Sequence, residues 1–260
     1  MPVLKRSSTY KAKGIVLSRR ELGDTDRIVT LYTREFGLRR LVARGSRKPS
    51  SPLAPHIELF NHVRVFAAVG TNLDILSQVE ALETYPRLRS DLGAFAAAGW
   101  AIELLDGLSE QGERVPQAYE ALLTFLRGLD LSEQPPEFWL GALALTLLDI
   151  HGFRPELEIC ADCGREIEAG HHAFAPAAGG LICDSCAPRH AAQPLSIEVL
   201  KTLRYLLAEG FHGAGRLTAD PAVRAEVRQI LRGYATATVE REIKSARMLE
   251  DADAGPRPRR

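Results

Sequence analysis

The first 80 residues alternate between short apolar runs and turn-forming residues. The runs, rich in Val, Ile, Leu and Thr, occupy residues 14–17, 28–33, 38–43, 56–68 and 73–79. Gly23-Asp24-Thr25-Asp26 separates the first two runs, and Gly37 stands in the break before the third. Because short β-branched runs and a period of two are typical of strands, the pattern predicts five strands, linked mostly by hairpin-sized turns. Five such strands fit a small barrel of the OB type or of the SH3-like type, and periodicity alone does not separate the two.

From Pro86 onward the apolar positions recur with the period of a helix. The first stripe covers residues 88–105. Proline in a first turn, and serine or aspartate just before it, are signals for the start of a helix. The candidate starts are Ser90 or Asp91, Pro116, Pro135-Pro136, Pro194 with Ser196, and Asp220-Pro221. We expect Gly210 to end the fourth helix and the last helix to reach about Met248. A helical bundle is therefore predicted after the barrel.

All four cysteines of the chain lie in one window between these helices. They form two C-x-x-C pairs, Cys160 with Cys163 and Cys183 with Cys186, and nineteen residues separate the pairs. Two residues between cysteines let a tight turn present both sulfurs to one cation, and this connector length is typical of zinc ribbons. We therefore expect one tetrahedral Zn²⁺ held by four thiolates. A closed shell of four sulfurs leaves no position for an activated water, so the zinc is expected to be structural.

Other interpretations of the cysteine window are two disulfides or four unrelated buried thiols. Both are disfavoured because no thiol occurs elsewhere and the chain carries no export signal, which indicates a reducing, cytoplasmic compartment. His171, His172 and His190 lie close by and are alternative ligands for one sulfur position. Four thiolates already satisfy zinc, so the four-cysteine set is preferred.

The net charge of zero hides a strong segregation of charge along the chain. Residues 1–52 carry 13 lysines and arginines against 4 acidic residues, whereas residues 53–150 carry 5 against 14. A basic first module suggests a polyanionic partner. The acidic middle offers either a docking groove for a partner peptide or simply a solvated surface. With 45% hydrophobic and 25% charged residues, and no apolar stretch near the roughly 18 residues of a membrane span, the chain fits a soluble protein of two or three domains.

The predicted barrel concentrates cationic side chains on its strands and loops. The candidate DNA-binding residues are Lys11, Lys13, Arg19, Arg20, Arg39, Arg40, Arg44, Arg47 and Lys48. Cations that follow a phosphate backbone, with aromatic rings on which bases stack, are the usual means of binding single strands. Tyr10, Tyr32, Phe36 and Phe66 are available for stacking, although core packing is preferred for Tyr32 and Phe66 on their apolar strands.

Several catalytic motifs are absent from the sequence. It contains no G-x-x-x-x-G-K-[ST], G-x-G-x-x-G, G-x-S-x-G or H-E-x-x-H. Asp24 and Asp26 are the only carboxylate pair beside the basic strands, and we interpret them as turn residues because aspartate stabilises turns through its side chain. The sequence therefore predicts a binding protein with no catalytic residues.

Three groups of residues resemble the bacterial RecO family of recombinational repair mediators. They are Gly14-Ile15-Val16-Leu17 with Gly23-Asp24-Thr25-Asp26, residues 29–33, Gly37 and Ala43-Arg44-Gly45-Ser46-Arg47; Gly152-Phe153-Arg154-Pro155-Glu156-Leu157 and Phe174-Ala175-Pro176 with Gly179-Gly180 around the cysteine pairs; and residues 203–207 with Lys244-Ser245. The resemblance spans most of the chain. One departure is Asp24, where the family more often has glutamate; the residue is still acidic.

This resemblance implies an OB-fold in residues 1–82, followed by a helical domain in residues 83–152 and 190–250. The predicted zinc insert then covers residues 153–189, and residues 251–260 form a disordered basic tail. The fold class is thus α+β and multidomain: a five-stranded OB-type barrel, then an α-helical domain with an inserted four-cysteine site.

The resemblance also implies a function. A member of this family binds single- and double-stranded DNA, anneals complementary strands without ATP and, with RecR, helps RecA replace single-strand-binding protein on gapped DNA. The helical part of related proteins receives the C-terminal peptide of single-strand-binding protein. Such a protein acts in the cytoplasm, in association with the nucleoid.

Two other classes of protein remain open from the residues. A zinc-containing RNA-binding or ribosome-associated factor could use the same barrel, because a basic groove does not distinguish the two sugars without contacts to the 2′-hydroxyl. A zinc-containing enzyme that modifies nucleic acid is the other class, and the closed cysteine shell disfavours it.

Overall fold

The structure is a computed structural model that describes residues 8–167, 173–246 and 248–249. It divides into two compact units, one formed by Met1–Pro86 with Ser109–Leu123 and one formed by Arg87–Leu108 with Thr124–Arg260. The domain boundaries given above therefore stay a prediction, and the predicted basic tail lies outside the described residues. Each unit is treated by itself below.

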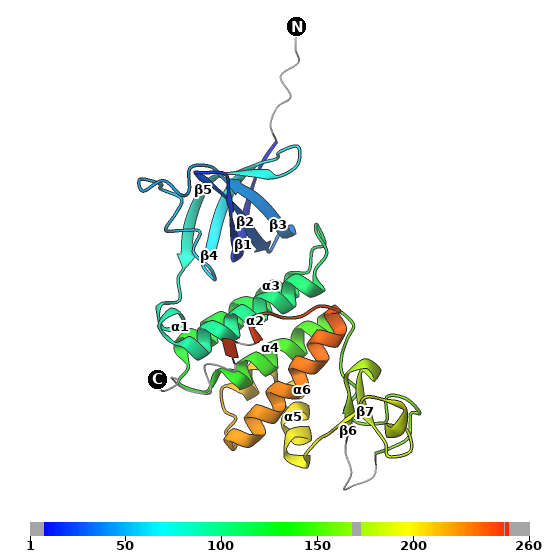
Figure 1. Ribbon diagram of the computed structural model, residues 1–260. Coiled ribbons are helices and arrows are strands. Elements are labelled where there is room, and N and C mark those ends of the chain that lie inside the picture. The colour runs from blue at the N-terminus through cyan, green and yellow to red at the C-terminus, as the bar shows by residue number, and fades with distance from the viewer. Residues whose placement is uncertain (1–7, 168–172, 247, 250–260) are drawn as a thin grey trace, which may run out of the picture. The chain divides into compact units, whose positions relative to one another are not determined.

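The first unit contains a closed five-stranded barrel (Figure 1). Its strands are β1 (Thr9–Leu22), β2 (Asp26–Thr33), β3 (Gly37–Ala43), β4 (His62–Ala68) and β5 (Asp74–Glu83). The order around the barrel is β1-β2-β3-β5-β4, closed by antiparallel pairing of β1 with β4. Only the short β3–β5 pairing is parallel among these strands. The crossover between β3 and β5 gives a Greek-key barrel, as in OB-folds, so the predicted five-stranded barrel is confirmed.

Side chains alternate along each strand, so those on one face fill the barrel interior and those on the other face lie outside. Val16, Leu31, Leu41 and Val65 are among the inward residues, each at most 2% exposed. One end of the outer face is also buried, because Tyr32 and its neighbours lie under residues 109–119 of the same unit. The Tyr32 hydroxyl donates to the carbonyl of Val115 at 3.4 Å. Tyr32 is therefore a core residue, as predicted.

The second unit is helical. Its helices are α1 (Pro86–Ser90), α2 (Leu92–Leu108), the second half of α3 (Pro116–Leu131), α4 (Pro136–Ile150), α5 (Ile197–Ala214) and α6 (Pro221–Val239). Helix α4 packs against α2, α5 and α6, so its apolar residues are buried around most of its circumference (Figure 1). No helix in the described ranges is both long enough and apolar enough to cross a membrane.

Three predicted helix caps are present. The Asp91 carboxylate accepts the backbone N–H of Ala94 at 2.7 Å before α2. Ser196 and Asp220 accept backbone N–H groups in the first turns of α5 and α6. Each side chain satisfies a donor that has no partner within its own helix, which is why the helices begin there.

A small sheet interrupts the helices and was not predicted. It consists of β6 (Ala173–Ala175), β7 (Gly180–Ile182) and β8 (Gln193–Pro194), in the order β7-β6-β8, with short 3₁₀ turns η1 (Pro176–Ala178) and η2 (Ala187–Arg189). The sheet carries the second cysteine pair directly after β7.

Three predicted boundaries are wrong. Strand β4 begins at His62 rather than at residue 56, because residues 53–60 fold into turns that bond internally, with the His56 N–H donating to the Leu53 carbonyl. Gly210 breaks the helical geometry with φ of 55°, but α5 resumes and continues to Ala214. The last helix ends at Val239, where Glu240 adopts a left-handed conformation that terminates it.

Candidate metal centre and nucleic-acid interface

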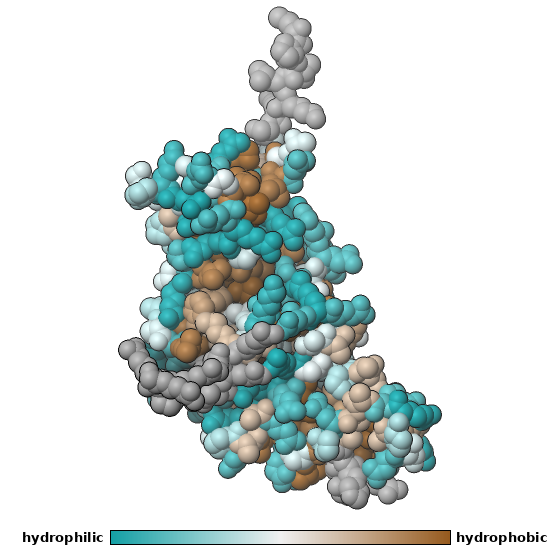
Figure 2. All heavy atoms as spheres, viewed as in Figure 1, coloured by the Kyte–Doolittle hydropathy of each residue, from teal (hydrophilic) through white to brown (hydrophobic). Residues whose placement is uncertain are grey.

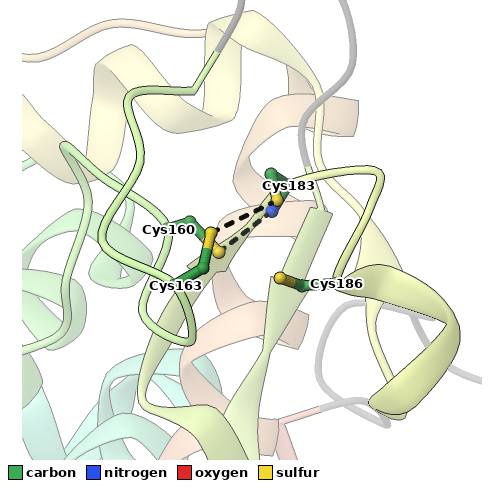
Figure 3. A group of neighbouring side chains, drawn as sticks. All are labelled: Cys160, Cys163, Cys183 and Cys186. Carbon is green, nitrogen blue, oxygen red and sulfur yellow. Dashed lines mark hydrogen bonds between the residues drawn. The ribbon is translucent and has the colours of Figure 1, made fainter.

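The four cysteine sulfurs point toward one another (Figure 3). One pair stands on the loop of Cys160 and Cys163, and the other follows β7 at Cys183 and Cys186. All four Sγ atoms lie within 4.8 Å of one another. A tetrahedron with Zn–S bonds of about 2.3 Å has edges of about 3.8 Å. The Cys163 and Cys183 sulfurs are 3.8 Å apart, so the donor set fits a tetrahedral thiolate metal, and no disulfide joins the four thiols.

Positive and N–H groups surround the sulfurs. The Arg165 Nε donates to the Cys163 Sγ at 3.4 Å, and a guanidinium nitrogen of Arg189 donates to the Cys186 Sγ at 2.9 Å. The Arg165 hydrogen bond, aided by a backbone N–H, lowers the pKa of the Cys163 thiol to about 6. Two arginines beside four thiolates offset the negative charge that would remain after a divalent ion binds.

The two most buried thiols differ from each other. For Cys160, burial opposes ionisation, but backbone N–H groups of Cys163, Cys183 and Asp162 outweigh it and lower the pKa of the thiol. For Cys186, burial dominates and raises the pKa to about 12. Because a metal ligand must be the thiolate, a bound cation has to displace the proton of Cys186.

His190 is the one of the three candidate histidines that the structure describes, and it is not part of the sulfur set. His190 directs its Nε2 to the Asp162 carboxylate at 2.9 Å, and this contact together with Arg189 lowers the pKa of Asp162. His190 thus acts as a partner of the loop rather than a ligand. His171 and His172 lie outside the described residues.

Four of the predicted DNA-binding residues are exposed cations on β1, on β3 and in the loop after β3: Arg20, Arg40, Arg44 and Lys48. Register places Arg40 opposite Thr30 on β2, and Arg20 opposite Ile28, so both side chains share the outer face of β1–β3. None of the four forms an ion pair within the ranges that the structure describes. This group is called the β1–β3 basic surface. Hydrophilic side chains cover much of the barrel face seen in Figure 2, around a hydrophobic patch.

Asp26 holds the loop of this surface in place. Its Oδ1 accepts the backbone N–H of Gly45 at 2.8 Å, and the Arg47 N–H donates to the Thr25 carbonyl at 2.9 Å. The Gly45 hydrogen bond, with one from the Thr25 hydroxyl, lowers the pKa of the Asp26 carboxyl. The interpretation of Asp26 as a turn residue is therefore confirmed, and the turn positions residues 44–48 against the β1–β2 hairpin.

The remaining predicted cations have other neighbours. Arg19 pairs with Glu58, and Arg47 pairs with Glu21 at 3.2 Å. Arg39 lies over the ring of Phe36, 5.5 Å from its centroid, on the inward side of β3 at the end of the barrel. Lys11 and Lys13 are exposed on β1 where it pairs with β4, away from the β1–β3 basic surface. The nine residues thus form no single continuous patch.

Sequence reasoning missed a cavity of about 390 Å³ in the helical unit. Trp100, Leu140, Leu231 and Leu249 contribute apolar walls, and Arg228 and Arg232 contribute charge. Glu137 also lines it and lies 3.8 Å from Arg228. A spacing of four between the arginines of α6 is the signal that could have located it, because residues at i and i+4 share a helix face. The cavity combines apolar walls with cationic groups.

The comparisons with known proteins agree with this architecture. Residues 7–85 match the family described as "Recombination protein O N terminal", and residues 89–247 match "Recombination protein O C terminal". The "DNA repair protein RecO" of Roseiflexus sp. is 39% identical over 247 residues, which cover 95% of this chain and 87% of the relative. That of Symbiobacterium thermophilum is 38% identical, with 93% and 96% covered. The chain therefore belongs to the RecO family of DNA repair and recombination proteins.

Proposed function

We propose that this chain binds single- and double-stranded DNA and anneals complementary strands without ATP. The observation that carries the proposal is the β1–β3 basic surface, whose four cations have no ion-pair partner in the described ranges and stand on strands and a loop held by Asp26. Family membership supplies the context of recombination and repair.

The chemistry of annealing asks for little more than this surface. Lysine and arginine side chains neutralise phosphates and release condensed counterions, which lowers the repulsion between two approaching strands. Arg44 and Lys48 on the loop extend the contacts of Arg20 and Arg40 on the strands. Because phosphate contacts carry no sequence information, affinity should vary little with sequence. Base pairing itself provides the specificity of the product.

A charge-matched pair of variants tests the surface. Arg40→Ala removes a cation without an ion-pair partner, whereas Arg34→Ala removes one that pairs with Glu120 at 2.7 Å in the same unit. Arg40→Ala should weaken DNA binding several-fold for every sequence and reduce the slope of log K against log salt by about 0.9. Arg34→Ala should change both quantities less. Equal effects of the two variants, measured by fluorescence anisotropy, would refute the assignment.

We also propose that the four-cysteine cluster holds one structural Zn²⁺. Cys163→Ala leaves three sulfurs and should reduce bound zinc from one per chain to a small fraction, as measured by a colorimetric chelator. Limited proteolysis should then cut within residues 153–189. His190→Ala is the matched control and should retain zinc, because the ring contacts Asp162 instead. Zinc loss in His190→Ala with retention in Cys163→Ala would reverse the ligand assignment.

For the helical unit we propose the C-terminal peptide of single-strand-binding protein as ligand of the cavity. The family resemblance supplies the partner. The chemistry supports it, since the apolar walls suit a hydrophobic terminal residue while Arg228 and Arg232 suit acidic side chains and a carboxylate. Arg232 lines the cavity one helical turn after Arg228, so it is the position chosen for the test.

The test uses a fluorescent acidic peptide with a hydrophobic C-terminal residue. Arg232→Glu should reduce its affinity at least tenfold, and Arg87→Glu, an exposed arginine of α1, should not. A peptide without the terminal apolar residue should bind weakly to all variants. If neither Arg232→Glu nor loss of the terminal apolar residue changes the affinity, the peptide binds outside this cavity.

We further propose that the chain acts in the cytoplasm with RecR to help RecA displace single-strand-binding protein. The proposal follows from the family and from the DNA and peptide contacts above. Purified chain with RecR should accelerate RecA assembly on gapped DNA covered by single-strand-binding protein. Arg40→Ala and Arg232→Glu should each slow this step, and no acceleration by the intact chain would contradict the proposal.

A further inference from the structure

The barrel has a second outward surface, on the opposite side of β1 from β2. In the β1–β4 and β4–β5 registers, Phe66 stands between Lys11 and Gln78, and Arg64 stands between Lys13 and Glu80. The neighbouring residues of β4, at positions 63, 65 and 67, fill the barrel core. Because side chains alternate along a strand, Arg64 and Phe66 therefore face outward.

Phe66 is an aromatic residue on the outside of a sheet. Its side chain is partly exposed, which corrects the preference for core packing, since the parity of β4 gives the interior to its valines and alanine. No stacked or edge-on aromatic partner accompanies it in the part of the chain described. The ring is thus partly exposed on the outer face of β4, without an aromatic neighbour in the described residues.

Cations and one amide surround this ring. Lys11, directly across the strand pair, and Lys13 are exposed and form no ion pair within the described ranges. Arg64 pairs with Glu80 at 2.6 Å, but both side chains are about half exposed or more, and such pairs contribute little and exchange readily. The Gln78 amide can donate to and accept from the edge of a base.

We propose that Phe66, with Lys11, Lys13, Gln78 and Arg64, is a second DNA site that is selective for single strands. The inference rests on the proposed function and deepens it. An unpaired base can stack on Phe66 while the lysines neutralise the adjacent phosphates. A base inside a duplex has both faces covered by its neighbours, so duplex DNA gains only the charge contacts.

This site is distinct from the β1–β3 basic surface. That surface uses Arg20 in the part of β1 that pairs with β2, Arg40 on β3 and the loop of residues 44–48. The Phe66 site uses β4, β5 and the first part of β1, which pairs with β4. One barrel therefore offers two sets of phosphate contacts. Two sets of phosphate contacts would let one barrel neutralise two strands at once, which lowers the repulsion between them and favours annealing.

The test compares three residues at position 66 in the full-length chain. Phe66→Leu keeps an apolar side chain but removes the stacking face, and should weaken binding of oligo(dT) about tenfold while changing duplex affinity less than twofold. The salt slope should stay as in the wild type. Phe66→Trp should retain affinity, and the fluorescence of the added indole, measured against the two native tryptophans, should be quenched by oligo(dT).

Two outcomes would overturn the second site. One is unchanged oligo(dT) affinity in Phe66→Leu together with unquenched fluorescence in Phe66→Trp. The other is an equal loss of single-strand and duplex affinity in Phe66→Leu with normal thermal unfolding. Failure of the second site is distinguished from failure of the proposed function, because in the latter case the wild-type chain itself would not bind DNA. Arg40→Ala serves as the comparison and should weaken the binding of both single-stranded and duplex DNA.

Discussion

Asp26 shows how one acidic residue can serve a cationic surface. Its carboxylate accepts the Gly45 N–H and lies near Arg44 and Lys48, whose charges also lower the pKa of the group. The residue thus fixes the loop that presents cations to a polyanion, although its own charge has the wrong sign for binding DNA. The same geometry explains why an aspartate in a turn is no evidence for a catalytic metal here.

Replacement of Asp26 gives the prediction at this scale. Because the folded pKa is lowered, the stabilising contribution is complete above the ordinary carboxyl pKa and is lost as pH falls through the lowered value. At pH 7, Asp26→Ala should increase hydrogen exchange at the Gly45 amide and weaken DNA binding several-fold. Asp26→Asn keeps an acceptor oxygen and should have a smaller effect. Exchange at Gly45 in Asp26→Ala that matches the wild type at pH 7 would contradict this role.

The hairpin between β2 and β3 depends on Gly37. It has φ of 62°, and a Cβ added there would lie 1.7 Å from the carbonyl oxygen of Glu113 in the same unit. Gly23 in the preceding hairpin has φ of 57° but open space around it. Comparing the two glycines therefore separates the free-energy cost of the left-handed backbone conformation from the cost of close packing.

Alanine at each position provides the prediction at the scale of the element. Gly23→Ala should cost about 1 kcal/mol of unfolding free energy, from the left-handed conformation alone. Gly37→Ala should cost about 2–4 kcal/mol, because residues 109–119 must also move away. Urea denaturation monitored by circular dichroism measures both values. Equal losses would mean that the contact with Glu113 does not constrain the hairpin.

The sequence predicted those elements whose signals are local. Alternation identified five strands, and Asp91, Ser196 and Asp220 marked helix starts because a cap depends only on residues within one turn. The three-residue strands around the cysteines carried too short a pattern for periodicity to detect. Phe66 was misplaced because an aromatic residue in an apolar strand has the same composition whichever face it occupies. Register, which depends on the partner strand, decided the face.

The candidate sites divide in the same way. The four cysteines converge as their spacing predicted, since C-x-x-C geometry is local. The nine cations do not form one patch, because salt bridges such as Arg47 with Glu21 depend on strand pairing that spacing does not reveal. The helical cavity is lined by residues of α2, α4 and α6, so no single segment of the sequence could predict it.

The cationic side chains proposed to bind DNA and the four-cysteine candidate metal site lie in different compact units of the molecule. The β1–β3 basic surface and the Phe66 site belong to the unit that contains the barrel, whereas all four cysteines belong to the helical unit. As a member of the RecO family, the chain is a non-catalytic mediator. The roles of the two units are therefore distinguished by measuring stability and DNA binding. Removal of the metal should therefore affect one unit and spare the function of the other.

Treatment with a strong chelator tests this separation. Loss of zinc should lower the midpoint of thermal unfolding and expose residues 153–189 to protease, because the proposed metal joins the two cysteine loops. Without it, the small sheet and contacts such as Arg204 with the Leu157 carbonyl and Tyr234 with the Phe153 carbonyl remain. The affinity for oligo(dT) and its salt slope should change less than twofold, since the barrel cations and the cysteines belong to different compact units. Readdition of Zn²⁺ should restore the midpoint. A large, zinc-reversible fall in DNA affinity would instead show that the metal segment contributes directly to the DNA surface.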